Sequence, residues 1–257
     1  MNNFYTDKKI LEAQKTIKII DNYIEDEILL RDIEQDQDFF PKKMGEEARQ
    51  LKTGNIYHGE SSIYSPWMFW DGWWRSPADT VKKRLVQQIW EPNLPCSIDE
   101  VIGFEYWTRT YGPGQYLPLH LDEDTFLYER TGEFRCPVLG AVYYAHFDVD
   151  DNNEAGFLEI HSGQVYIDTN KRYQLATFQE ENEDKEKSIA LNSYYRSQNQ
   201  VDKIAYIPNR LIIFDAGMVI HGTTKNGNNG KRYIMGINVW HKDYPPIGYT
   251  EKLFVFE

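Results

Sequence analysis

From about residue 100 onward, the chain consists of short runs rich in β-branched and aromatic residues, separated by Gly, Pro, Asn and Asp. Many short runs at such spacing are typical of the strands of a β-sandwich or β-barrel. The sequence therefore predicts a mainly β core. The predicted strands are residues 102–111, 138–149, 156–160, 164–167, 205–207, 211–214, 218–221 and 232–240.

The first hundred residues have a different pattern, which predicts helices before the β core. Apolar residues recur at steps of three and four over residues 7–35, without Pro or Gly, and again over residues 78–90, where Pro92 ends the run. We therefore expect an N-terminal helical and aromatic extension over residues 1–99, packed on a core over residues 100–257. The two parts are expected to form one structural unit.

Composition excludes several classes of protein. An aromatic content of 15% indicates an ordered globular chain, and 257 residues are enough for a sizeable core. The net charge of −12 argues against a nucleic-acid partner, which requires clustered Lys and Arg. No apolar run approaches a membrane span, no secretory signal is recognised, and only two Cys occur, so we expect a cytoplasmic protein without a membrane partner.

Three His-x-Asp sequences are candidate metal-binding segments, although the spacing alone is not specific: they begin at His120, His146 and His241. Residues i and i+2 of a strand share a face, so the imidazole and the carboxylate can bind one metal ion. A second His from another strand would complete a two-His, one-carboxylate site, which suits Fe(II) and leaves coordination positions open.

The surrounding sequence distinguishes the three occurrences. His241 has no later His to complete a site, and His146 lies in a strongly apolar run, where a structural role is the more common one. His120 and Asp122 instead follow a turn, Gly-Pro-Gly at residues 112–114. His221 closes an apolar run, and Arg232 begins the next predicted strand, where its guanidinium could hold a carboxylate with two hydrogen bonds.

In these segments the sequence resembles the Fe(II)- and 2-oxoglutarate-dependent dioxygenases, in particular their prolyl-hydroxylase-like branch. The resemblance covers roughly residues 102–241 and rests on the order and spacing of several segments. These are Tyr111 to Asp122 (YGPGQYLPLHLD), Val142 to Tyr144, Gly156 to Ile160, Asn209 to Phe214, His221, Arg232-Tyr233 and Trp240. The branch often has Gly-Gly where this chain has Ala155-Gly156, and its first segment is one residue longer.

The resemblance implies a double-stranded β-helix core, of the jelly-roll or cupin-like kind. It implies that His120, Asp122 and His221 bind iron and that Arg232 binds the distal carboxylate of 2-oxoglutarate. Tyr111 and Tyr144 would contact that co-substrate or line its site. Successive side chains of a strand point to opposite faces of the sheet. Only one of Lys231 and Arg232, and only one of Tyr143 and Tyr144, should therefore face the co-substrate.

The implied activity is hydroxylation by O2, coupled to decarboxylation of 2-oxoglutarate to succinate and CO2, with ascorbate as a possible reductant. The carboxylate of Asp122 favours hydroxylation over halogenation. The substrate could be a small metabolite such as an amino acid, or a protein side chain such as proline. The alternatives are a non-catalytic cupin-like binding module and, disfavoured by the negative charge, a nucleic-acid demethylase.

Three further segments have two interpretations each. The aromatic residues between Tyr64 and Trp74 could line a substrate site, but their spacing favours packing of the extension on the core. Asp148, Asp150, Asn152 and Glu159 have the spacing of calcium-loop ligands but lack the central Gly, which favours a plain hairpin loop. The charged run at residues 179–200 is expected to be an exposed loop, with a substrate lid as the alternative.

Overall fold

The computed structural model describes residues 5, 7–36, 39–40, 63–64, 68–117, 119–145, 155–161, 200–227, 230–250 and 255–256. Strands dominate these residues, which confirms the predicted mainly β fold with N-terminal helices. The helices are α1 (Lys8–Gln14), α2 (Glu27–Gln35), α4 (Val81–Trp90), the 3-10 helix Ile98–Glu100, α5 (Thr125–Thr131) and α8 (Ile247–Thr250). The strands are β1 (Lys18–Ile20), β2 (Ile63–Tyr64), β3 (Met68–Trp70), β4 (Val101–Tyr111), β5 (Leu139–Tyr144), β6 (Phe157–Ile160), β7 (Asp202–Ala205), β8 (Arg210–Phe214), β9 (His221–Thr223), β10 (Arg232–His241) and β11 (Val255–Phe256).

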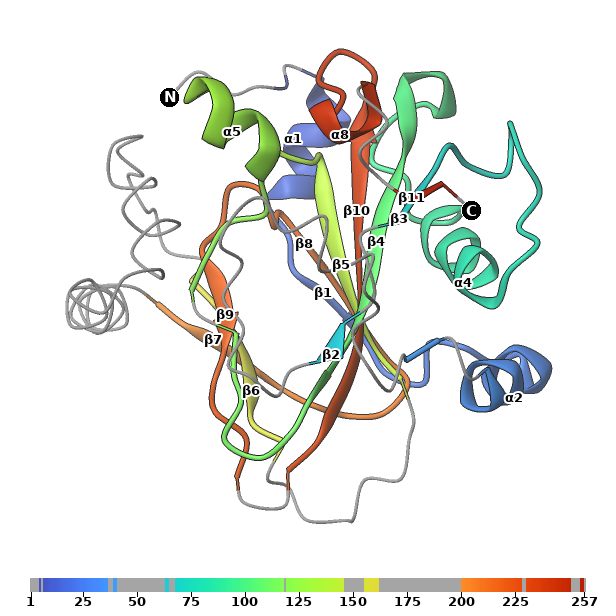
Figure 1. Ribbon diagram of the computed structural model, residues 1–257, viewed down its shortest axis with the longest axis vertical. Coiled ribbons are helices and arrows are strands. Elements are labelled where there is room, and N and C mark those ends of the chain that lie inside the picture. Colours follow the sequence, from blue (N-terminus) through green and yellow to red (C-terminus); the bar gives the residue numbers. More distant parts are fainter. Residues whose placement is uncertain are drawn as a thin grey trace.

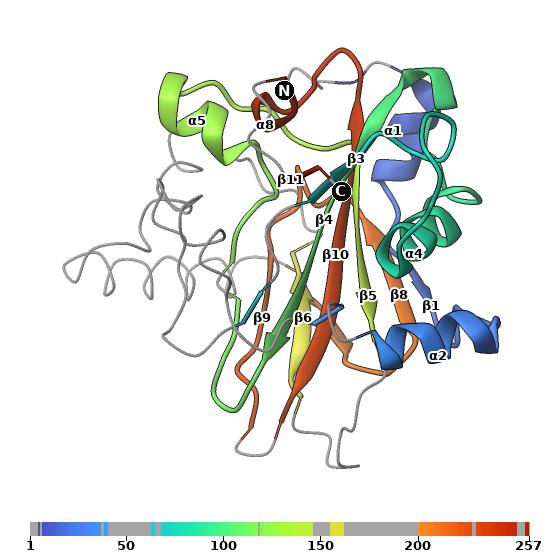
Figure 2. The same ribbon diagram turned by 45° about the vertical axis from the view of Figure 1, so that its right-hand side comes forward.

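The strands form two sheets. The larger has the order β1-β8-β5-β10-β4-β3-β11, with β2 also paired to β4, and the smaller has the order β7-β6-β9. All pairs are antiparallel except β11 with β3. Figure 1 shows the smaller sheet on one side of the larger one, with α2 and α4 on the other side; Figure 2 shows the same arrangement from a second direction.

The four central strands of the larger sheet are covered on both faces, which explains their nearly continuous apolar sequences. Alternate residues belong to two separate cores. On the outer face, Tyr106, Tyr143, Leu211 and Met235 pack with residues of α2 and α4. On the inner face, Tyr111, Tyr144, Ile212 and Ile234 pack with Leu158 and Ile160 of the smaller sheet. The inner face is where the two sheets meet, and it is where functional side chains gather.

The single helix predicted over residues 7–35 is wrong, because a strand divides it. β1 pairs antiparallel with β8, and Lys18 lies opposite Ile213. Ile17, Ile19 and Ile20 are β-branched, so a sheet edge suits them better than a helix. The flanking helices α1 and α2 each begin with an Asp cap: Asp7 and Asp26 accept hydrogen bonds from backbone N–H groups of the first turn.

Other boundaries follow the sequence pattern more closely. The helix predicted over residues 78–90 is confirmed as α4, which begins after the cap Thr80. Two predicted strands are displaced. β7 ends at Ala205 because the chain turns at residues 206–209, where Asn209 has a positive φ. β9 begins at His221 rather than ending there, because residues 215–219 form a turn in which Met218 N–H donates to Asp215.

The N-terminal residues contribute to the same larger sheet through β1, β2 and β3, and the separation of an extension from a core near residue 99 stays a prediction. Three Trp of the aromatic segment (Trp70, Trp73 and Trp74) surround Phe104 of β4, with ring centroids 5.6 to 6.2 Å apart. These indoles therefore pack on the outer face of the sheet, away from the inner-face side chains considered next. Among the described residues, no helix has the length and apolar character needed to cross a membrane.

Candidate metal centre

Three of the residues selected from the sequence come together between the two sheets: His120, Asp122 and His221. One potential ligand atom from each lies within 4.8 Å of the other two. The Nε2 atoms of His120 and His221 lie 3.4 and 3.6 Å from Oδ1 of Asp122, and the imidazole centroids are 4.3 Å apart. Within the described part of the chain, this is the one cluster of at least three His, Cys, Asp or Glu suited to a metal ion.

Backbone pairing fixes the two histidines relative to each other. His120 and His221 form an isolated antiparallel bridge, in which each N–H donates to the carbonyl of the other residue at 2.8 and 2.9 Å. The N–H of Asp122 donates to the carbonyl of Ala216 at 2.9 Å, and this bond fixes the third member. The segment after the Gly-Pro-Gly turn thus runs beside the start of β9.

A hydrogen bond at Nδ1 orients the ring of His221 and leaves Nε2 as its potential ligand atom. Its Nδ1 lies 3.0 Å from the carbonyl oxygen of Val219, which can only accept, so Nδ1 carries the proton. Phe214 packs edge-on against the ring at 4.8 Å. A hydrogen bond from the other ring nitrogen is the usual means of orienting a metal-binding His.

The electrostatics of the cluster favour the protonation states that bind a metal ion. Burial alone would raise the pKa of Asp122, but hydrogen bonds and charge interactions with His120 and His221 outweigh it and hold that pKa well below its usual value. Burial, together with the neighbouring His120, lowers the pKa of His221. The result is an ionised carboxylate beside a neutral imidazole, as metal coordination requires.

The cluster is open on one side. The side chain of His221 is 5% exposed, whereas those of His120 and Asp122 are 24% and 13% exposed. A metal ion held here would be shielded on the His221 side and accessible on the other.

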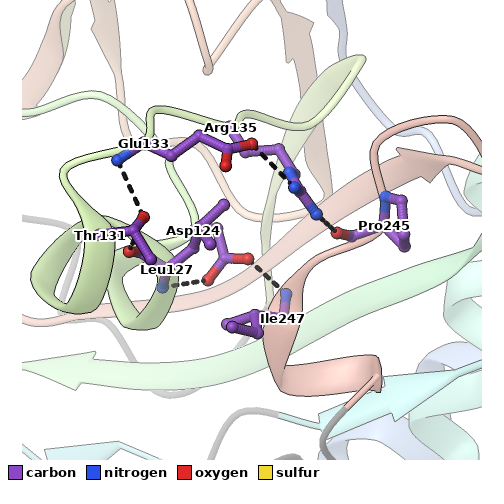
Figure 3. A network of polar contacts seen from close by, with 7 residues as sticks. All are labelled: Asp124, Leu127, Thr131, Glu133, Arg135, Pro245 and Ile247. Carbon is purple, nitrogen blue, oxygen red and sulfur yellow. Dashed lines mark hydrogen bonds and ion pairs between the residues drawn. The ribbon is translucent and has the colours of Figure 1, made fainter.

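A polar network around Asp124, two residues after Asp122, connects α5 with α8 (Figure 3). Buried Asp124 caps α5 by accepting a hydrogen bond from Leu127 N–H at 3.0 Å and also accepts one from Ile247 N–H at the start of α8. Its own N–H donates to the carbonyl of Arg135. Asp124 thereby fixes the chain two residues after Asp122.

Arg232 is a buried cation with unused hydrogen-bonding capacity. It is 1% exposed, and its Nη2 donates to Thr223 Oγ1 at 2.9 Å and to the Thr224 carbonyl at 3.1 Å. Its Nε and Nη1 have no hydrogen-bond partner among the described residues. Burial lowers its pKa, partly opposed by Tyr111 and Tyr144. Buried guanidinium N–H groups without partners are rare, and they fit an anionic ligand.

The two tyrosines selected from the sequence lie beside this guanidinium. The Cζ atom of Arg232 lies 4.9 Å from the ring centre of Tyr111, whose buried Oη has no partner among the described residues. Tyr144 is buried on the same inner face, and burial raises its pKa. Lys231 is exposed, and Tyr143 packs in the core on the outer face of the larger sheet. Of each pair, Arg232 and Tyr144 are therefore the residues on the inner face.

The other sequence candidates lie elsewhere. His241 lies 3.6 Å from Asp243, but neither residue belongs to the metal-ligand cluster found within the described residues. His58, His146, the carboxylates at 148–152 and residues 179–199 fall outside the described residues. The charged run therefore stays a prediction.

Several inner-face residues were missed by sequence reasoning: Thr223, Glu105 and Asn238. Thr223 holds Arg232, and Glu105 and Asn238 lie opposite each other on β4 and β10. The alternation of β10 could have indicated Asn238, since Arg232, Ile234, Gly236 and Asn238 share one face of a strand.

Comparisons with known proteins agree with the fold. No protein-family model matches the sequence, and no curated protein sequence matches it. A solved structure of HygX from Streptomyces hygroscopicus, with nickel and 2-oxoglutarate bound, is 13% identical, with a TM-score of 0.50 over 94% of this chain and 90% of that one. A prolyl-4-hydroxylase from Pseudomonas putida is also 13% identical, with a TM-score of 0.48 over 91% of this chain and 97% of that one. The chain therefore shares its fold with the HygX structure, and the double-stranded β-helix core that the sequence resemblance implied is confirmed.

Proposed function

We propose that this chain is an Fe(II)- and 2-oxoglutarate-dependent dioxygenase that hydroxylates a small molecule or a protein side chain. The observation that carries the proposal is the presence of two complementary features between the two sheets. One is a cluster of two imidazoles and a carboxylate, and the other is a buried guanidinium with two unused N–H groups. The fold shared with a structure that binds nickel and 2-oxoglutarate supports it.

The donor set fits the metal. Two neutral imidazole nitrogens and one carboxylate on one side of an ion leave the opposite positions open, as in non-haem Fe(II) oxygenases. In this proposal His120, Asp122 and His221 hold the iron, and the bound iron with 2-oxoglutarate supplies the oxidation by O2. Ascorbate would serve as an external reductant.

The surroundings of Arg232 fit a dicarboxylate co-substrate. Arg232 would bind its distal carboxylate through Nε and Nη1, while Thr223 keeps the guanidinium in place through Nη2. The unused Oη of Tyr111 would donate a further hydrogen bond to the bound anion. Pairing the buried cation in this way also removes the cost of leaving its N–H groups unsatisfied.

The proposal is tested by adding Fe(II), ascorbate and 2-oxoglutarate to the purified protein and measuring succinate, which is expected to form slowly even without the primary substrate. Asp122→Ala should lose both metal binding and succinate formation. Asp243→Ala, at the exposed carboxylate of another His-x-Asp sequence, is the matched control and should retain both. Equal metal affinity in the Asp122→Ala variant and the wild type would contradict the assignment. A calorimetric titration of the Mn(II)-loaded protein with 2-oxoglutarate that gives no heat would favour a non-catalytic binding module.

A further inference from the structure

The inner face carries a second set of polar groups that neither the metal cluster nor the Arg232 site uses. Asn238 of β10 and Glu105 of β4 lie directly opposite each other in the sheet. Asn238 is 3% exposed, and Glu105 is partly exposed. Oε2 of Glu105 accepts a hydrogen bond from Trp240 Nε1 at 3.1 Å, and a hydrogen bond from the Asn238 amide is among the contacts that oppose the rise of the Glu105 pKa. The hydrogen bond to Glu105 turns the amide nitrogen of Asn238 toward that side chain.

The amide oxygen of Asn238 is then left without a donor. Asn238 Oδ1 is buried and has no hydrogen-bond partner among the described residues. It lies beside the metal cluster: a Cβ atom placed on Gly140 would be 2.9 Å from Asn238 Oδ1 and 3.6 Å from Asp122 Oδ2. A buried acceptor without a donor is costly, so this oxygen is suited to accept a hydrogen bond from a ligand.

The next cross-strand pair on the same face of the sheet carries an apolar side chain. Trp107 lies opposite Gly236, one step along the sheet from the Glu105 and Asn238 pair. The indole rests on the backbone of β10, because a Cβ on Gly236 would lie 2.5 Å from two of its ring atoms. An apolar wall next to a few fixed polar groups is the usual composition of a small-ligand site.

We propose that Asn238, supported by Glu105, is a specificity-determining residue that accepts a hydrogen bond from an ammonium or hydroxyl group of the primary substrate. The hydrocarbon part of the substrate would pack against Trp107, close to the metal. The substrate class is thus a molecule with a hydrocarbon part and a hydrogen-bond donor. This inference rests on the proposed function for the position of the metal.

The test uses protein loaded with Mn(II) and 2-oxoglutarate, and three probes of similar shape: cyclohexylamine, cyclohexanol and cyclohexanone. Bound Mn(II) shortens the relaxation times of nearby ligand protons, so the measurement reports binding close to the metal without turnover. The amine is expected to bind about tenfold more tightly than the ketone, which cannot donate, and the alcohol a few-fold more tightly. If the amine binds more tightly than the alcohol, the donor of the primary substrate is an ammonium group. If the alcohol binds more tightly, the donor is a hydroxyl group.

Two variants connect the preference to Asn238. In Asn238→Leu the amine and the ketone should bind equally, within about twofold, and the milder Asn238→Ser should give an intermediate preference. Gln200→Leu, which replaces an exposed amide by the same apolar side chain, is the control and should behave as wild type. Equal relaxation by all three probes in the wild-type protein, with Mn(II) bound, would overturn the inference. Failure of the protein to bind Mn(II) at His120, Asp122 and His221 would instead refute the proposed function.

Discussion

His120 and His221 are joined by two backbone hydrogen bonds, each N–H donating to the carbonyl oxygen of the other residue. The ring positions therefore depend on main-chain pairing between β9 and the segment after residue 117, and not on side-chain contacts alone. Such a support holds the imidazoles close together before any ligand binds, which reduces the ordering cost of binding.

Arg232 and its neighbour Lys231 give a direct test of the co-substrate site. Arg232→Met should lower the affinity for 2-oxoglutarate roughly 30-fold or more, because a buried charge pair would lose one partner. Lys231→Met removes the same charge from an exposed position and should change the affinity less than about twofold. Calorimetric titration of both variants with Mn(II) present measures the difference, and similar losses in the two would argue against a specific role for Arg232.

Gly156 should be essential to the Arg232 site for a steric reason. It has φ +71°, and a Cβ there would lie 2.7 Å from Thr224 Oγ1 and 3.2 Å from Arg232 Nη1. Gly132 has φ +70° with nothing within 4 Å of such a Cβ. Both Ala variants should lose about 1–2 kcal/mol from backbone strain, but only Gly156→Ala should also weaken 2-oxoglutarate binding. Urea unfolding and calorimetry separate the two effects, and unchanged binding in Gly156→Ala would show that the guanidinium adapts.

Glu105 should make the stability of the metal-free protein depend on pH. Burial, opposed by the hydrogen bond from Trp240 and reinforced by the charges of Asp122 and Asp124, raises the pKa of Glu105 to about 8. The folded state therefore binds its proton more tightly than the unfolded state, so the free energy of unfolding should fall as pH rises from about 4.5 to 8.

Replacement of Glu105 by Gln should remove that part of the pH dependence. Near pH 5 the variant and the wild type should unfold at similar denaturant concentrations, and at pH 8.5 the variant should be more stable by about 1–3 kcal/mol, since the side chain is partly exposed and solvent reduces the full effect. Glu25→Gln, at an exposed position, is the control. Parallel pH profiles for the wild type and Glu105→Gln would contradict this prediction.

Asp124 should matter to the metal site as well as to stability. Asp124→Ala removes hydrogen bonds to α5 and α8 from a buried carboxylate and should cost about 2–4 kcal/mol. It should also weaken metal binding about tenfold, because the chain after Asp122 loses its support. Asp26→Ala removes the cap of α2, which lies on the other side of the larger sheet from β9 (Figure 1), and should cost about 1 kcal/mol with unchanged metal affinity. Urea unfolding and metal titration test both, and equal metal affinities in the two variants would show that Asp124 is structural only.

The sequence by itself was enough to predict which residues could form the site and that the fold is mainly β. Alternation along β4 and β10 specifies which residues share a face, and thus why Arg232 and Lys231 point to opposite sides. The resemblance to a known family, which rests on the order and spacing of segments that include His120, Asp122, His221 and Arg232, implied a double-stranded β-helix, and that fold is confirmed.

Tertiary structure decided what local pattern leaves open. Residues 17–20 fit a helix or a strand, and pairing with β8 selected the strand. The surrounding sequence selected His120 and Asp122 among three His-x-Asp sequences, but only the backbone pairing of His120 with His221 brings the second imidazole beside them. The contact of Asn238 with Glu105 joins positions far apart in the sequence, so its physical basis, the register between β4 and β10, exists only in the folded sheet.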